Sequence, residues 1–469
     1  GKRMEALYPD IPKPLIPVKG MPILEHALME CKKYGFLDIV LLLHYKKEDI
    51  MNYFGDGSKW GMSLSYLFEE VPLGTGGALY KCADYVNESF LIIYADVYSL
   101  VNLKKLHDFH CASNNQLTCV VHPNDHPFDS DILETDLCNR ILKIHPHPHD
   151  KKSWLPNSVN AALYCCNKSI FDVKVDKEKF DIAQDLLSFA LSKNCKVGAY
   201  KTIEYIKDMG TVERLSKVEA DIANGIVLAR SAKNKKKAIY LDRDGTLNFE
   251  RGHIADPKDF QLYPKVAESV AKINSSEYLC LCVTNQPVIA RGDLSVDGLK
   301  SIHNKMETLL GKHGAYLDDV IFCPHHPDRG FEGEVIELKK NCNCRKPSTG
   351  MFEHLSKIYN IDSRKSFVIG DRFTDVVAGN NIGSKTIMLH SGATNKQENF
   401  AARPYLVLPG LVEAIDFILH IQDKVRQAAE KIQTLLKKDV RLLFLGGDCS
   451  KSRFAVSSQL KRNLRYAVI

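Results

Sequence analysis

The sequence predicts an α/β protein that consists of two consecutive doubly wound domains. Its 469 residues are enough for two to three domains. In the first part of the chain, helical patterns separate three buried-strand candidates, as a parallel sheet requires; these lie at residues 39–43, 90–94 and 117–121. In the second part, strand candidates end in acidic or hydroxyl side chains, which is typical of ligand sites in open α/β sheets.

A lysine-rich run at residues 233–237 separates the two predicted domains. We interpret it as a solvated, flexible linker rather than a nucleic-acid-binding patch, although it supplies part of the net charge of +6. The expected organisation is a first domain at 1–225, a basic linker at 226–236, a second domain at 237–420 and an extension at 421–469.

The composition is that of a globular protein, with 45% hydrophobic and 26% charged residues. The sequence has no run of about 18 apolar residues and no visible signal peptide, so no membrane span is expected. The cysteine usage fits a reducing compartment. We therefore expect a cytoplasmic protein without nucleic-acid or membrane partners.

Two aspartates directly follow the strand candidate at residues 237–241. Asp242 and Asp244 are two residues apart, so at a strand end they can face one pocket. Two such carboxylates can hold a divalent cation, and one can attack phosphorus while the other moves a proton. The alternative is an ordinary Asp-Gly turn with solvated acids, since Gly245 comes next.

Matching partners for these aspartates follow along the chain. Thr284 lies at the end of an apolar run and offers a hydroxyl to a phosphate oxygen. Arg345 and Lys346 supply the positive charge that a transferring phosphoryl group requires. Asp371 ends a further strand candidate. We expect these side chains at one edge of the sheet, where open α/β sheets bind ligands.

The order of these motifs resembles the haloacid-dehalogenase phosphatase superfamily. The resemblance implies that Asp242 is the nucleophile that becomes an aspartyl phosphate and that Asp244 is the general acid/base. It also implies that Thr284 and Lys346 bind the phosphate. A magnesium ion would be held by Asp242, Asp244 and Asp371.

A second group of residues has the spacing of a zinc site. Cys323 and His325 form one close pair, and Cys342 and Cys344 form another. Three thiolates and one imidazole suit tetrahedral zinc, and four protein ligands leave no position for water, so the ion is expected to be structural. It would hold the loop that carries Arg345 and the following lysine. The alternative is a set of unrelated buried cysteines, in a chain with 14 of them.

Over residues 236–420 the motifs resemble the D-glycero-D-manno-heptose 1,7-bisphosphate 7-phosphatases, whose close relatives are the histidinol-phosphate phosphatases. The Cys-x-His spacing of this family favours His325 over His326 as the zinc ligand. The resemblance implies that three residues contact the substrate: Asn285, Arg291 and Arg345. Two positions depart from the family pattern, because Pro287 replaces a small residue and His253 stands where a tyrosine is common.

The first domain has four features that suit phosphate and nucleotide chemistry. Residues 11–15 form a rigid proline turn that presents Lys13. Residues 73–78 form a glycine-rich loop that lets a nucleotide approach the backbone closely. Asp96 follows a strand candidate, and Asp208 lies in a Lys-Asp-Met-Gly-Thr motif.

The order of these features resembles the sugar-phosphate nucleotidyltransferases. The resemblance implies that Arg3 lies at the end of a triphosphate loop, that Lys13 binds a phosphate and that Asn160 contacts the sugar. Asp96 and Asp208 would hold magnesium while the sugar 1-phosphate attacks the α-phosphorus, so that catalysis rests on positioning and charge neutralisation. The family's opening strand would precede Gly1. The residues implied to contact the base and ribose are Gly74, Thr75, Gly76 and Gly77.

Together the two resemblances predict an enzyme that joins two steps of nucleotide-activated heptose synthesis. Its ligands would be a sugar phosphate and a nucleoside triphosphate, and its cofactors Mg²⁺ and Zn²⁺. Two alternatives remain open: the substrate is histidinol phosphate or another small phosphoester, or the first domain is an inactive sugar-nucleotide-binding or scaffold module.

Two further segments are interpreted without assigning an activity. The histidine-rich stretch at residues 144–149 is expected to be a surface loop rather than a metal site, because its prolines scatter the imidazoles. Residues 440–453 faintly resemble the first strand and phosphate loop of a P-loop kinase, but they lack the Gly-Lys-Ser/Thr that binds phosphate.

Overall fold

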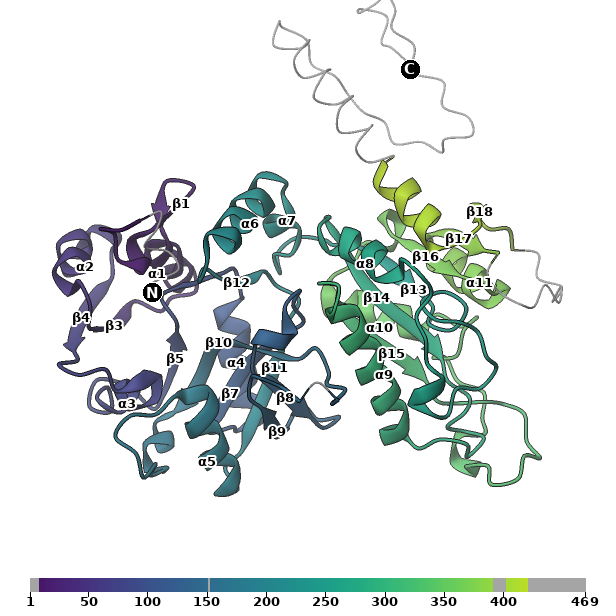
Figure 1. Cartoon of the computed structure of the whole chain (residues 1–469), viewed down its shortest axis with the longest axis horizontal. Coiled ribbons are helices and arrows are strands. Elements are labelled where there is room, and N and C mark those ends of the chain that lie inside the picture. Colours follow the sequence, from purple (N-terminus) through teal and green to yellow (C-terminus); the bar gives the residue numbers. More distant parts are fainter. Residues whose placement is uncertain (1–7, 151, 391–401, 421–469) are drawn as a thin grey trace, which may run out of the picture. The chain divides into compact units, whose positions relative to one another are not determined.

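The computed structural model describes residues 8–150, 152–390 and 402–420 (Figure 1). The described residues up to Asp416 form one compact unit, which contains the predicted first domain and the second domain up to that residue. Arg3 and the segment at 440–453 lie outside the described residues, so the predictions made for them stay predictions. No helix within the described ranges is long and apolar enough to cross a membrane.

The second domain is built on a parallel six-stranded sheet with the strand order β15-β14-β13-β16-β17-β18 (Figure 1). This confirms the predicted doubly wound α/β class for this half. The strands are β13 (Lys237–Leu241), β14 (Tyr278–Asn285), β15 (Asp319–Cys323), β16 (Phe367–Gly370), β17 (Lys385–Leu389) and β18 (Leu406–Leu408). The helices are α8 (Val266–Asn274), α9 (Val296–Gly311), α10 (Gly350–Tyr359) and α11 (Phe373–Asn381).

The central strands of this sheet are almost continuously apolar because helices cover them. Seven of the eight residues of β14 are buried, and so are four of the five residues of β13. Phe352 of α10 packs edge-on against Tyr240 of β13, with ring centroids 5.1 Å apart. The register pairs Leu241 with Ile369 of β16 and with Cys282 of β14, so the carboxyl ends of these strands lie side by side.

The first domain has a sheet of mixed direction. Its six-stranded sheet has the order β11-β7-β10-β8-β9, with β5 also paired to β10, and β3 and β4 form a separate parallel pair. The strands of this domain are β1 (Pro17–Val18), β2 (Met21–Pro22), β3 (Asp38–Leu43), β4 (Ser63–Phe68), β5 (Ser89–Ile93), β6 (Val97–Ser99), β7 (Leu117–His122), β8 (Ile132–Thr135), β9 (Ile141–His145), β10 (Val159–Asn167), β11 (Val197–Lys201) and β12 (Ile206–Asp208).

The helices of this domain lie between several of its strands along the chain. They are α1 (Ile23–Lys33), α2 (Lys47–Phe54), α3 (Gly74–Tyr80), α4 (Leu103–Ser113), α5 (Leu187–Ser192) and α6 (Val212–Ala223). The three strands predicted from the sequence are present as β3, β5 and β7. The expected parallel pairing is only partly present, because β7 pairs parallel with β11, whereas β10 pairs antiparallel with both β5 and β7.

The predicted linker is only partly a solvated segment. Its first residues form the short helix α7 (Ile226–Ala229), and the next residue, Arg230, is buried in an ion pair with Asp318. Lys236 is only 4% exposed, and its ammonium donates to the carbonyl of Ser231 at 2.9 Å. The interpretation of the lysine run as solvated throughout is therefore wrong at Lys236, because that ammonium finds backbone acceptors.

Candidate functional site

Asp242 follows directly after β13 and points into a site at the carboxyl edge of the sheet. Its backbone N–H donates to the carbonyl of Ile369 at 3.0 Å, and its carboxylate accepts from the N–H of Arg243 at 2.7 Å. Gly245 then turns the chain with a φ of 78°, and a Cβ at this position would lie 2.2 Å from the Asp371 carboxylate. Glycine is required here both by the backbone angle and by this close approach.

Lys346 is the buried cation of the site. Its ammonium lies 2.9 Å from the Asp242 carboxylate and 2.6 Å from the Asp375 carboxylate, and it donates to the carbonyl of Val283 at 2.7 Å. Burial alone would lower the pKa of Lys346, but the charges of the two carboxylates outweigh it and raise that pKa. The ammonium therefore stays charged beside Asp242.

Three buried carboxylates form a group that can hold a metal ion. Donor oxygens of Asp242, Asp371 and Asp375 all lie within 4.8 Å of one another. Burial and the charges of the other two aspartates raise the pKa of Asp371 to about 8. Burial likewise raises the pKa of Asp375 to about 6, although Lys346 opposes it. One oxygen of Asp371 is buried without a hydrogen-bond partner among the described residues.

This donor set fits Mg²⁺, which prefers carboxylate oxygens. It differs from the sequence prediction in one residue, because Asp375 joins Asp242 and Asp371 in place of Asp244. Asp375 is the third residue of α11, so the sequence alone could not distinguish a helix-capping carboxylate from a metal ligand. A Cβ on Gly370 would lie 2.3 Å from the Asp375 carboxylate, which shows how closely the strand end approaches it.

Asp244 lies in a separate hydrogen-bonding network. Its carboxylate accepts from Arg243 at 2.9 Å, from Asn248 at 2.9 Å and from Gln286 at 2.8 Å. Burial would raise the pKa of Asp244, but the charge of Arg243 and these hydrogen bonds lower it on balance. The resting carboxylate is therefore ionised and is ready to accept a proton. These three partners were not predicted, although all of them lie in the recognised motifs.

Thr284 and Asn285 end β14 next to the lysine loop. The buried Thr284 hydroxyl accepts from Gln286 at 2.9 Å. The side-chain amide of Asn285 makes two hydrogen bonds of 3.0 Å with the backbone of Lys346. Asn285 is thus connected to Asp242 through Lys346, and Thr284 is connected to Asp244 through Gln286.

The four predicted zinc donors form one cluster. The sulfur of Cys344 lies 3.2 Å from those of Cys323 and Cys342, and 3.2 Å from Nδ1 of His325. These contacts are far longer than a disulfide bond of about 2.05 Å. They approach the edges of about 3.8 Å expected for a zinc tetrahedron with bonds of about 2.3 Å. The donor chemistry therefore fits Zn²⁺, and His326 is not part of the cluster.

The zinc cluster lies beside the phosphate site. Cys323 ends β15 and is paired in register with Asn285 of β14. The guanidinium of Arg345 donates to the carbonyl of His325 at 3.2 Å. The cluster thus fixes the backbone on both sides of the loop that leads to Lys346.

Replacement of Cys342 by serine is expected to remove the zinc. The wild-type chain should hold about one zinc per molecule and Cys342→Ser almost none, because a hydroxyl is a poor replacement for a thiolate ligand. Elemental analysis of the purified proteins measures this. Cys138→Ser is the matched control, since Cys138 is exposed and outside the cluster. Equal zinc contents in the wild type and Cys342→Ser would contradict the assignment.

The predicted magnesium ligands of the first domain lie on neighbouring strand ends. Strands β6 and β12 pair Val97 with Asp208, and the N–H of Met209 donates to the carbonyl of Asp96 at 2.8 Å. The carboxylate of Asp96 forms an ion pair with Lys13 at 2.8 Å. Lys13 and Asp96 thus lie next to each other, and their roles in binding phosphate and magnesium stay predictions.

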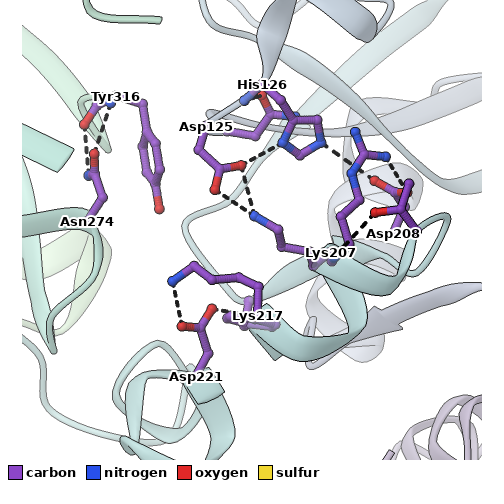
Figure 2. A network of polar contacts seen from close by, with 12 residues as sticks. Asp125, His126, Lys207, Asp208, Lys217, Asp221, Asn274 and Tyr316 are labelled. Atoms are coloured by element: carbon purple, nitrogen blue, oxygen red, sulfur yellow. Dashed lines mark hydrogen bonds and ion pairs between the residues drawn. The ribbon is translucent and has the colours of Figure 1, made fainter. Parts of the chain in front are cut away.

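Asp208 belongs to a network of alternating charges (Figure 2). Arg214 lies 2.6 Å from its carboxylate, and His126 lies between Asp208, at 3.5 Å, and Asp125, at 2.6 Å. Burial would raise the pKa of Asp208, but the hydrogen bond from His126 and the charge of Arg214 lower it overall. Lys207 completes the network with an ion pair to Asp125 at 2.7 Å.

The glycine-rich segment of this domain is packed against a second chain segment. Helix α3 begins at Gly74, and the N–H groups of Gly76 and Gly77 donate to the carbonyl of Phe180 at 2.9 and 3.3 Å. A Cβ on Gly74 would lie 2.5 Å from that carbonyl oxygen. The hydroxyl of Thr75 donates to Asp181 at 3.0 Å. In this arrangement the glycines are needed for packing.

Asn160, the residue predicted to contact the sugar, lies on β10. Its side-chain amide donates to the hydroxyl of Tyr164 at 2.9 Å, and its side-chain oxygen accepts from the N–H of Ala162 at 3.3 Å. A contact between Asn160 and a sugar remains a prediction.

The fold and the two groups of residues define a haloacid-dehalogenase phosphatase domain that follows a nucleotidyltransferase domain. Residues 1–225 match the family model for nucleotidyl transferases, and residues 343–414 match a HAD-hydrolase-like model. The D-glycero-beta-D-manno-heptose-1,7-bisphosphate 7-phosphatase of Haemophilus ducreyi is 36% identical over 185 residues, which are 39% of this chain and 98% of the relative. Through its second domain the chain belongs to this phosphatase family.

Two solved structures are also similar. HddC from Yersinia pseudotuberculosis shares 25% identity over 47% of this chain and 94% of its own length, with a TM-score of 0.40. The D,D-heptose 1.7-bisphosphate phosphatase from B. bronchiseptica, complexed with magnesium and phosphate, shares 27% identity over 39% of this chain and 98% of its own length, with a TM-score of 0.35.

Proposed function

We propose that the second domain removes the 7-phosphate of D-glycero-D-manno-heptose 1,7-bisphosphate and that the first domain then transfers a nucleotide to the heptose 1-phosphate. The main support for the phosphatase reaction is a buried group of side chains at the carboxyl edge of the sheet. The group consists of Asp242, Lys346, Asp371 and Asp375. The similarity to heptose bisphosphate phosphatases over nearly their whole length supports the substrate class. The fusion supports the second step, since the product of one domain is the substrate class of the other.

In the first step, the Asp242 carboxylate attacks the phosphorus of the 7-phosphate, and the bond from phosphorus to the sugar oxygen breaks. Lys346 and the Thr284 hydroxyl bind the oxygens of the transferring group, whose charge they compensate. Asp244 first takes up a proton from solvent when the anionic phosphate binds, and it then delivers this proton to the leaving sugar oxygen, which returns Asp244 to the carboxylate form. In the second step, Asp244 takes a proton from water as that water attacks the aspartyl phosphate and releases inorganic phosphate.

Asp242, Asp371 and Asp375 would hold Mg²⁺ at this site. When bound, the ion would neutralise the negative charge that gathers where an anionic phosphate meets three carboxylates. Lys346 alone cannot balance this charge. The buried oxygen of Asp371, which has no hydrogen-bond partner among the described residues, is therefore free to bind the ion.

Side-by-side phosphate release from heptose 1,7-bisphosphate and histidinol phosphate tests the proposed substrate. We expect kcat/KM for the bisphosphate to be higher by about 100-fold, since one or two charged hydrogen bonds to a second phosphate contribute about 1.5–3 kcal/mol each. Equal or higher kcat/KM for histidinol phosphate would favour the histidinol-phosphatase alternative instead.

For the first domain, one observation favours the scaffold alternative. Asp96 and Asp208 already form ion pairs with Lys13 and Arg214, and the N–H groups of two glycines are engaged by Phe180. Calorimetry with GTP, CTP and UTP separates the two possibilities. A nucleotidyltransferase should bind one of them in a magnesium-dependent manner, whereas an inert scaffold should bind none.

A further inference from the structure

The guanidinium of Arg291 lies between two side chains that come from different loops. On one side it lies 3.0 Å from Nε2 and 3.4 Å from Nδ1 of His253. On the other side its centre lies 4.5 Å from the ring centroid of Phe331, which is a cation–π contact. The Nε of Arg291 is buried without a hydrogen-bond partner among the described residues. The orientation of Arg291 therefore depends on His253 and Phe331.

The contact with His253 requires a neutral imidazole. A guanidinium only donates hydrogen bonds and is always charged, so a protonated ring would place two positive charges at this distance without an acceptor between them. His253 in turn lies 3.9 Å from a carboxylate oxygen of Asp293 through Nδ1. The remaining charged groups that act on His253 are Glu250 and Arg372, which form an ion pair with each other at 2.7 Å.

Burial and the charge of Arg291 lower the pKa of His253 on balance, although Asp293 and Glu250 oppose them. His253 therefore stays neutral to a lower pH than an ordinary histidine does. The contact with Arg291 is present while the ring is neutral and is lost as the ring takes up a proton.

Phe331 is supplied by the loop between the two pairs of zinc ligands. This loop packs on the turn that carries Arg291, because a Cβ on Gly292 would lie 1.9 Å from the carbonyl oxygen of Gly333, and the N–H of Val335 donates to Ala290 at 3.0 Å. Lys339 also lies over the Phe331 ring, at 4.2 Å. These contacts between the two loops place Phe331 beside Arg291.

We infer that His253 is a positioning residue that orients Arg291 toward the part of the substrate that does not react, and that it does so only while its ring is neutral. This inference rests on the proposed function, since it assigns to Arg291 the recognition of the second phosphate. The reacting phosphate, bound at Asp242 and Lys346, is not affected by it.

The test compares KM for heptose 1,7-bisphosphate across pH in the wild type, His253→Gln and His253→Ala. Between about pH 7.5 and about pH 5, KM of the wild type should rise about tenfold relative to that of His253→Gln, whose amide accepts from Arg291 but does not titrate. His253→Ala should show a KM raised about tenfold at every pH, with kcat unchanged. Phe331→Leu should raise KM without changing its pH dependence. His354→Gln, at an exposed histidine of α10, should behave like the wild type.

Hydrolysis of p-nitrophenyl phosphate, which has no second phosphate, separates this inference from the proposed function. All variants should hydrolyse it equally. If none of the proteins releases phosphate from either substrate, the proposed function is wrong. If the bisphosphate is hydrolysed but the wild type and His253→Gln have the same dependence of KM on pH, the role of His253 is overturned.

Discussion

The variant Asp242→Asn is expected to lose phosphate release by about four orders of magnitude or more, the effect of removing a nucleophile from an active site. The amide has the shape of the carboxylate but cannot form the aspartyl phosphate. The fold should survive, because Lys346 keeps its contacts with Asp375 and with the carbonyl of Val283. Steady-state phosphate release with saturating Mg²⁺ measures the loss.

The matched control is Asp259→Asn, an exposed aspartate of the same domain that should retain full activity. Thermal unfolding should give similar midpoints for the wild type and both variants. Phosphate release by a folded Asp242→Asn at a rate near that of the wild type would show that this carboxylate is not the nucleophile.

The variant Lys346→Met should lose both activity and stability. It removes the buried cation between Asp242 and Asp375, and breaking a buried ion pair in this way costs about 3–5 kcal/mol of unfolding free energy. Urea unfolding without divalent cations measures this cost. Added Mg²⁺ should restore part of the stability, because an ion that binds only the folded carboxylate group favours the folded state.

Lys312→Met is the control for this prediction, since Lys312 is an exposed lysine at the end of α9. Its unfolding free energy should match that of the wild type. If Lys346→Met had the same unfolding free energy as the wild type, the Lys346 ammonium would not stabilise the buried carboxylates. The electrostatic account of the site would then be wrong.

The sequence predicted which site residues lie close together where those residues follow a predicted strand. Asp242, Thr284 and Asp371 each follow an apolar run, and parallel strands bring their carboxyl ends to one edge, so their proximity could be predicted. The zinc donors could be predicted because thiolates and imidazoles in close pairs have few other uses. Asp375 could not be predicted as a metal ligand, since a carboxylate in the first turn of a helix is also an ordinary cap.

The direction of strand pairing in the first domain could not be predicted from the sequence. Apolar runs such as those of β5 and β7 indicate buried strands, but they do not give the direction of the neighbouring strands. The nine-residue strand β10, which pairs antiparallel with both, determines the mixed sheet. The contact of Arg291 with His253 and Phe331 could not be predicted either, because it joins three loops that are far apart in the sequence.

The central claim is that this chain removes the 7-phosphate of a heptose bisphosphate and leaves the 1-phosphate for nucleotidyl transfer. Phosphorus NMR of heptose 1,7-bisphosphate, incubated with the intact chain and Mg²⁺, follows both phosphates at once. The account predicts that the 7-phosphate signal is replaced by inorganic phosphate while the 1-phosphate signal persists. Loss of the 1-phosphate first, or no release of phosphate from either position, would contradict it.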